Sequence, residues 1–190
     1  MKNIYYYYAL SQKSPAGFAK RLCFLLERSD IGSRPLILLC IGSDRSTGDS
    51  LGPLIGHKLE NTLTQRVLVY GTLKRPVHAM NLCEVLRRIA MFHPDAFVIA
   101  IDASLGSNCH VGYVTLSDTS LRPGLGVQKN LPAVGDLCIT GIVNLSGDTD
   151  GLQLQSTRLS TVMELADFIS SGIQLALHTY ESSSITCNSR

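Results

Sequence analysis

The sequence predicts a three-layer α/β/α sandwich with a mostly parallel central sheet, and three observations lead to this fold class. Residues 36–42 and 97–102 form short apolar runs without polar alternation, which is typical of strands buried on both faces. Segments with helical hydrophobic spacing separate the apolar runs along the chain. Strands joined through helices form parallel βαβ units with right-handed crossovers. Because 190 residues fit one domain, we predict a single α/β domain over residues 1–190.

The composition limits the classes of binding partner and the cellular compartment that are expected for the protein. Lys and Arg total 17 against 15 Asp and Glu, giving a net charge of +2, and neither sign forms a run. This balance argues against nucleic acid and an anionic membrane, so a protein or peptide is the expected partner, and a homo-oligomer is left open. Six scattered cysteines without a CxxC pair favour a reducing compartment. No apolar run approaches the roughly 18 residues of a membrane span, so we expect a cytoplasmic protein.

The first part of the chain predicts an arm followed by a helix. Residues 1–13 carry a tyrosine cluster without a clear period, and we interpret them as an arm that packs on the body or on a second subunit. A disordered tail is the alternative. Ser14 and Pro15 resemble an N-cap followed by proline at the first helical position, so a helix is expected from there to about Arg28.

The middle of the chain predicts three strands and two helices. The strand at residues 36–42 precedes a helix that begins near Asp49. A β-branched strand at 67–71 precedes a helix at about 77–92, and the strand at 97–102 follows. The second helix is expected to direct a stripe of apolar residues toward the core: Met80, Cys83, Val85, Leu86, Ile89 and Ala90.

The last part of the chain predicts two strands, a long loop and a closing helix. The strands at 111–116 and 137–145 flank a loop at 117–136 that is rich in glycine and proline. Loops of this length inside a compact domain are usually functional or disordered. A long helix is expected over about 159–180, and residues 181–190 are expected to form a flexible tail.

Two carboxylates are expected at the carboxyl ends of neighbouring strands, in the middle of the sheet. Asp49 follows the first buried strand, and Asp102 ends the strand reached after two crossovers. Ligands of open parallel sheets bind outside the carboxyl ends of the strands, where the strand order reverses. Two carboxylates in one crevice can share a proton, which leaves one as a base and the other as an acid. The structural alternatives are a helix N-cap for Asp49 and a turn cap for Asp102.

Other polar residues are weaker candidates. Asp44 is assigned to substrate binding, with a solvated loop position as its alternative. His110 is considered as a third metal ligand, and Cys109 with His110 as a nucleophile and base. Because no metal ligand set is complete, no cofactor is expected, and a metal ion at Asp49 and Asp102 is left open. The other four histidines are interpreted as residues of helix surfaces or helix ends: His57, His78, His93 and His178.

The loop at 117–136 is predicted to border the aspartate crevice and to help bind substrate. Gly124 and Gly126 allow a close approach of the backbone, and Lys129 supplies a positive charge near the carboxylates or near a carbonyl oxygen on which negative charge develops. The alternative is a mobile surface loop without a functional role.

At these residues the chain resembles a known family. The segments GDSLGP around Asp49, VIAIDASLG around Asp102 and LSDTSLRPGLGV over residues 116–127 are similar, in the same order, to segments of the spore germination protease. The size and layout more closely resemble the YyaC-type sporulation proteins, which are short relatives of that protease in spore-forming bacteria. The resemblance implies the phosphorylase/hydrolase-like α/β/α architecture that the hydrogenase maturation proteases share.

The resemblance also implies a function. Asp49 and Asp102 match the two acidic residues assigned to catalysis in the germination protease, which degrades small acid-soluble DNA-protecting proteins during germination. In the maturation proteases the matching positions bind a nickel ion of the substrate. We therefore expect a sporulation-associated peptidase of the mother cell or forespore cytoplasm, in which an aspartate dyad activates water. The alternative is a non-catalytic sporulation factor that binds a peptide or protein partner in the same crevice.

Overall fold

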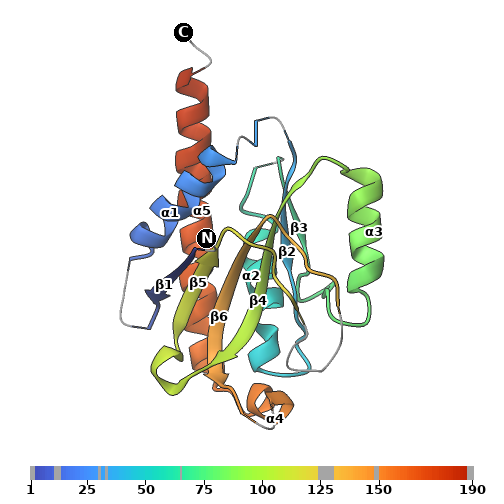
Figure 1. Ribbon diagram of the computed structural model, residues 1–190, viewed down its shortest axis with the longest axis vertical. Coiled ribbons are helices and arrows are strands. Elements are labelled where there is room, and N and C mark those ends of the chain that lie inside the picture. The colour runs from blue at the N-terminus through green and yellow to red at the C-terminus, as the bar shows by residue number, and fades with distance from the viewer. Residues whose placement is uncertain are drawn as a thin grey trace.

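The computed structural model describes residues 3–10, 14–29, 31–32, 34–64, 66–123, 131–147 and 150–187, with side chains described through residue 183. These residues form one six-stranded sheet in the order β1-β5-β6-β4-β2-β3, with helices on both faces (Figure 1). The predicted three-layer α/β/α sandwich is therefore confirmed.

Two buried strands lie side by side in the middle of the sheet, as predicted. β2 (Leu36–Cys40) pairs in parallel with β4 (Phe97–Gly106). Every residue of β2 is buried, as expected for an apolar run covered on both faces. β6 (Leu137–Leu145) is parallel to β4 on its other side, and β3 (Val67–Tyr70) is parallel to β2 at the edge of the sheet. The carboxyl ends of these four strands therefore meet at one end of the sheet.

The opposite edge of the sheet contains the one reversed strand among the described residues. β5 (Tyr113–Ser117) runs antiparallel to β6, and β1 (Ile4–Tyr8) runs antiparallel to β5. The sheet is thus mostly parallel, as predicted. The tyrosine-rich segment packs on the body as an edge strand, and the Tyr7 ring meets the Phe18 ring edge-on with centroids 5.5 Å apart.

The helices cover the two faces of the sheet unequally. α1 (Ala16–Arg28), α2 (Leu51–Leu59) and α5 (Leu159–Cys187) lie on one face, and α3 (Leu82–Phe92) lies on the other (Figure 1). The predicted helix is confirmed, but Pro15 is its N-cap residue and Ala16 its first helical residue, so the predicted N-cap at Ser14 is wrong by one position. The two faces consequently have separate hydrophobic cores, a larger one under three helices and a smaller one under α3.

The central strands contribute alternate residues to the two cores. Leu38 and Ile101 belong to the larger core, whereas Ile37 and Ala100 belong to the smaller core. This is the alternation expected of a strand, whose successive side chains point to opposite faces. Asp102 comes two residues after Ala100 in β4 and therefore lies on the α3 side of the sheet.

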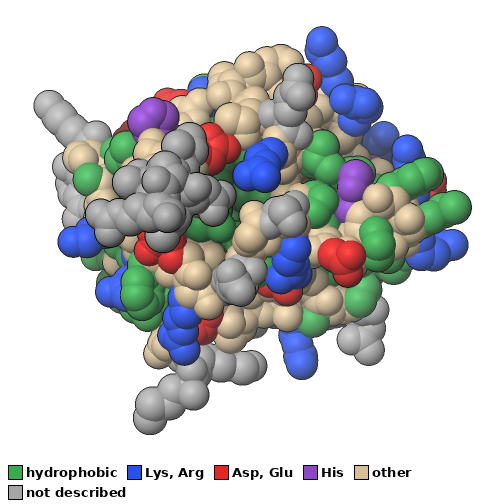
Figure 2. Space-filling view, turned by 90° about the horizontal axis from the view of Figure 1, so that it is seen from above, with side chains coloured by type: hydrophobic (Ala, Val, Ile, Leu, Met, Phe, Trp, Pro, Cys, Tyr) green, Lys and Arg blue, Asp and Glu red, His purple; other side chains and the backbone are tan. Residues whose placement is uncertain are grey.

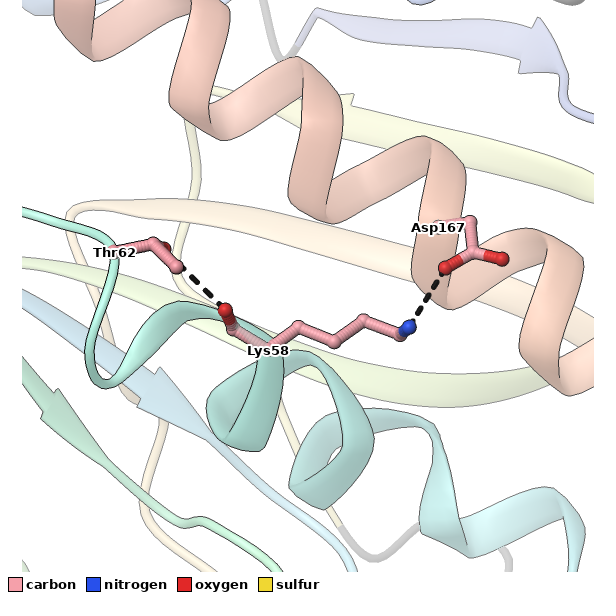
Figure 3. Close-up of polar contacts among 3 residues, drawn as sticks. All are labelled: Lys58, Thr62 and Asp167. Carbon is pink, nitrogen blue, oxygen red and sulfur yellow. Dashed lines mark hydrogen bonds and ion pairs between the residues drawn. The ribbon is translucent and has the colours of Figure 1, made fainter.

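The helix that follows the first candidate aspartate is fixed mainly by apolar contacts. Leu51, Ile55 and Leu59 of α2 are fully buried in the larger core. At the surface, Lys58 Nζ lies 2.8 Å from Asp167 Oδ1 of α5 (Figure 3). Because both side chains of this ion pair are partly exposed, it contributes only about 0–1 kcal/mol. The buried face of α2 therefore determines its position.

α3 begins later than the sequence predicted. The backbone N–H of His78 donates to Asn81 Oδ1 at 2.8 Å, and this turn replaces the first predicted helical turn. The predicted core positions of Met80, Cys83 and Ala90 are therefore wrong, since all three are exposed and Met80 is 78% exposed. With the start shifted, the apolar residues that α3 packs toward the sheet are Leu82, Val85, Leu86 and Ile89.

Two features near the C-terminus were not predicted. A short helix, α4 (Asp150–Gln155), follows β6, where a segment of six residues is too short to reveal a helical period. α5 continues to Cys187, so residues 181–187 are helical where a flexible tail was expected. Among the described residues, no helix combines the length and apolar character that crossing a membrane requires.

Candidate active site

Asp49 lies in a loop that returns from the end of β2 to the start of α2. It occupies a single 3₁₀ turn, η1 (Gly48–Ser50), whose N-cap position is Thr47, while Ser50 is the N-cap position of α2. The interpretation of Asp49 as a helix N-cap is therefore wrong. Its backbone carbonyl accepts the N–H of Ser43 at 3.0 Å, which closes the loop around the end of β2.

Asp102 lies within a strand rather than at its end. β4 continues to Gly106, so the interpretation of Asp102 as a turn cap is wrong. The residue is 9% exposed, and its Oδ1 accepts the backbone N–H of Ala103 at 2.8 Å. A carboxyl group this deeply buried is costly to ionise.

The structure brings the two aspartates together in one cleft. Asp49 and Asp102 both line a cavity of about 330 Å³ outside the carboxyl ends of β2 and β4. α4 lies at this end of the molecule (Figure 1) and supplies part of the wall through Gly151, Leu154 and Gln155. This is the position expected for a ligand site in an open parallel sheet.

The environment gives the two carboxyl groups different proton affinities. Burial is the main cause that raises the pKa of Asp102 well above its usual range, the nearby charge of Asp49 raises it further, and the Ala103 N–H opposes both. Burial also raises the pKa of Asp49, but the backbone N–H of Ser43 and the charge of His78 lower it. Of the two carboxyl groups, Asp102 therefore holds its proton more tightly than Asp49.

The buried carboxyl group should make stability depend on pH. The folded protein binds the Asp102 proton more tightly than the unfolded chain does, so the bound proton stabilises the folded state. This stabilisation is complete below the unfolded pKa of about 3.9 and is lost as the pH rises through the higher folded pKa. We expect the free energy of unfolding, measured by urea denaturation at a series of pH values, to fall with pH more steeply in the wild type than in Asp102→Asn. The control Asp44→Asn alters an exposed residue and should keep the wild-type slope. Equal slopes in all three proteins would contradict the assignment.

His78 is a cleft residue that the sequence analysis missed. It was interpreted as a helix-end residue, but it lines the cleft beside the aspartates. The N–H of Gly42 donates to the carbonyl of Val77 at 2.8 Å, and Ile41 pairs with Val77 in an isolated bridge. Because His78 directly follows Val77, this pairing brings His78 to the site. When its ring is neutral, Nδ1 accepts the Met80 N–H at 3.2 Å, which leaves Nε2–H to donate to a ligand. A single bridge leaves no periodic signal in the sequence.

The loop after β2 contributes polar side chains to the cleft, but the predicted Asp44 is not one of them. Arg45 and Ser46 line the cleft, whereas Asp44 is exposed and is not among the residues that line it. The assignment of Asp44 to substrate binding therefore finds no support. The Ser46 hydroxyl is buried without a hydrogen-bond partner among the described residues, so it is available to a bound molecule.

The long loop after β5 lines the cleft with residues from both its first and its last part. Pro123 and Leu131 line the cleft. A bridge between Leu121 and Val134 holds these two flanks together. The predicted substrate-binding residues of the loop, namely Gly124, Gly126 and Lys129, lie outside the residues that the structure describes.

The remaining candidates lie away from the cleft lining. His110 Nδ1 is 2.8 Å from Ser107 Oγ and 3.8 Å from Cys109 Sγ, but none of these three residues lines the cleft. Among the described residues, no group of three or more His, Cys, Asp or Glu side chains is arranged to hold a metal ion. The roles considered for Cys109 and His110 therefore find no support in the geometry.

The fold and the cleft define an α/β/α protein with two carboxyl groups at the switch point of its sheet. By sequence, the chain belongs to the family described as "Protein of unknown function (DUF1256)", whose model matches residues 6–172. It is 47% identical over 166 residues to the protein YyaC of Bacillus subtilis (strain 168), covering 86% of this chain and 81% of the relative. The resemblance to the YyaC-type proteins is thus confirmed.

A solved structure with a similar outline is the [NiFe] hydrogenase maturation protease HycI from Thermococcus kodakarensis KOD1. The comparison gives a TM-score of 0.44 at 18% sequence identity and covers 79% of this chain and 99% of that chain.

Proposed function

We propose that this chain is a sporulation-associated peptidase that hydrolyses a peptide bond of an endogenous spore protein. The observation that carries the proposal is the pair of carboxyl groups in one cleft, one of them buried with a raised pKa. A protonated and an ionised carboxyl group side by side are the acid and the base that amide hydrolysis needs.

In the proposed reaction, the ionised Asp49 removes a proton from a water molecule as the water oxygen bonds to the carbonyl carbon of the peptide. Protonated Asp102 gives its proton to the carbonyl oxygen, so the intermediate carries two hydroxyl groups and no net charge. Asp49 then returns its proton to the amide nitrogen, and Asp102 takes back a hydroxyl proton as the C–N bond breaks. The products are a carboxylic acid and an amine, and both aspartates regain their starting states.

Two other cleft residues suit supporting roles. His78 Nε2 and the Arg45 guanidinium are donors on the same cleft, and either can hydrogen-bond the carbonyl oxygen as negative charge develops there. Arg45 takes the role that the sequence analysis gave to Lys129, that of a positive charge near the carboxylates. The proposed chemistry needs only the two carboxyl groups and the donors around them.

The cellular setting is part of the same proposal. The similarity to YyaC of Bacillus subtilis supports a role in a spore-forming bacterium, and we place the protein in the cytoplasm of the mother cell or forespore. The expected substrate is a protein of that compartment.

A non-catalytic role is the second candidate. The cleft wall includes Met80, Leu131 and Leu154, which suit the binding of an apolar side chain without any reaction. A sporulation factor could use this wall to hold a peptide or protein partner.

Mapping of newly formed protein termini tests the proposal. The purified protein is incubated with a soluble extract of sporulating Bacillus subtilis, and new N-termini are labelled and identified by mass spectrometry. We expect cleavage products with the wild type and with Asp44→Asn, and none with Asp49→Asn/Asp102→Asn. Identical products with the double variant would contradict the peptidase proposal. Full function of the double variant in a sporulating strain, at normal protein levels, would favour the binding role.

A further inference from the structure

A second and larger cavity adjoins the candidate active site. It has a volume of about 650 Å³ and lies between the edge strand β3 and helix α3. Its lining runs from His78, at the carboxyl end of the strands, to His93, just beyond the end of α3. We refer to this cavity as the β3–α3 groove.

Among the described residues, no strand pairs with the outer side of the strand that forms one wall of the groove. β3 is the last strand of the sheet, and each of its four residues is only half-buried, whereas every residue of β2 beside it is buried. An edge strand presents backbone N–H and C=O groups that a further strand can use. An extended peptide can bind there by main-chain hydrogen bonds, with its side chains in the adjoining groove.

The charge of the groove favours an acidic occupant. Arg75 and Arg88 line it, and no Asp or Glu is among its lining residues. The one ion pair among the described residues joins Lys58 and Asp167, so neither arginine has a carboxylate partner within the described part of the chain. Lys and Arg side chains also gather on the side of the molecule where β3 and α3 lie (Figure 2).

The groove and the candidate active site are continuous. His78 lines both cavities, and its neighbours Ala79 and Met80 continue along the wall of the aspartate cleft. A strand that occupies the groove therefore ends beside Asp49 and Asp102.

We propose that an extended, acidic segment of the protein substrate adds to β3 as a further strand and directs the adjoining residues past His78 into the aspartate cleft. This inference rests on the proposed peptidase function, because it assigns that site its substrate class. The half-buried Leu68, Tyr70 and Val85 form the apolar part of the groove. The bound segment accordingly alternates apolar and acidic residues. Its apolar residues contact the apolar part of the groove, and its acidic residues pair with Arg75 and Arg88.

A binding measurement with designed peptides tests the groove. The probe is a fluorescein-labelled octapeptide of alternating valine and glutamate, and the protein is the full chain carrying Asp49→Asn and Asp102→Asn, so that binding is read without cleavage. We expect Arg75→Glu/Arg88→Glu to weaken binding about tenfold or more, because two attractive charge pairs become repulsive. The matched control is Lys74→Glu/Arg87→Glu, which changes the net charge equally at exposed neighbouring positions outside the groove lining and should stay within about twofold.

Two further measurements examine how the peptide binds. The same octapeptide with alternate backbone nitrogens methylated cannot donate those hydrogen bonds and should bind about tenfold more weakly or worse. Amide chemical shifts of the ¹⁵N-labelled protein should change at Val67–Tyr70 and along α3 when the unmodified peptide is added.

Several results would overturn the proposal. In the binding measurements, these results are the absence of binding at millimolar peptide and equal losses of affinity in both charge-reversal variants. Equal binding of a valine–lysine octapeptide or of single-stranded DNA would also overturn the proposal. So would chemical-shift changes away from β3, or self-association of the chain through β3. Cleavage of a mapped substrate that is unaffected by Arg75→Glu/Arg88→Glu would also overturn it while the peptidase function stands. Binding in the groove without cleavage of any protein would instead overturn the peptidase function alone.

Discussion

Replacing Asp49 by asparagine is expected to lower the rate of peptide hydrolysis by about 10³-fold, within the range typical of general acid and base groups. Asparagine cannot accept a proton from water, so the water molecule attacks without being deprotonated and is a weaker nucleophile. Asp102→Asn should lose less, about 10²-fold, because the amide still offers a neutral hydrogen-bond donor to the carbonyl oxygen although it cannot transfer a proton. The measurement is kcat/KM with a peptide that spans a mapped cleavage site, compared across the two single variants and the double variant.

The combination of the two replacements gives a sharper test than either one. Because the two carboxyl groups act on the same water and the same carbonyl, the loss in the double variant should be smaller than the product of the two single losses. Asp44→Asn, which changes an exposed carboxylate of the same loop, should retain wild-type kcat/KM. Wild-type rates in Asp49→Asn would show that another group is the base.

Gly42→Ala is expected to destabilise the fold by about 4 kcal/mol or more, which is at the severe end for single substitutions. Gly42 has a φ of 140°, which side chains disfavour, and a Cβ there would overlap the backbone carbonyl oxygen of Asp49. The new methyl group would also lie 3.1 Å from Pro53 Cδ. The loop that carries Asp49 would have to move away from β2, and urea denaturation followed by circular dichroism measures the cost.

Gly32→Ala separates the two causes of that loss. Gly32 also has a positive φ, 56°, but a Cβ there has no neighbour within 4 Å. Its replacement should cost only about 1–2 kcal/mol, the usual penalty for a side chain in this backbone region. If Gly42→Ala costs no more than Gly32→Ala, the close approach of Gly42 to the Asp49 carbonyl is not a constraint on the fold.

The two proposals assign different tasks to the cleft and to the groove. The cleft holds the two carboxyl groups proposed to transfer protons, Asp102 on β4 and Asp49 on the loop after β2, beside the most buried part of the sheet. The groove lies at the edge of the sheet, where open backbone groups can recognise a main chain in extended form. Under the two proposals, the buried centre of the sheet would perform the chemistry and the exposed edge would select the substrate.

The sequence by itself determined the central strands and the pair of aspartates at their carboxyl ends. The apolar runs that became β2 and β4 are long enough, and free enough of polar residues, to require burial on both faces, and parallel connection through helices then places their carboxyl ends together. Asp49 and Asp102 follow directly from that geometry. β6 (Leu137–Leu145) also has the predicted bounds, since its apolar run is clearly delimited by turn residues.

Only the tertiary structure decided which other residues reach the two aspartates. His78 enters the cleft through one bridge between Ile41 and Val77, residues 36 positions apart whose pairing no local pattern encodes. The same turn delays α3 and exposes Met80, against the helical period. The β3–α3 groove depends on β3 being the last strand of the sheet, which is a property of strand order. Hydrophobic periodicity specifies how each element is buried, whereas contacts between distant segments depend on how the elements pack against one another.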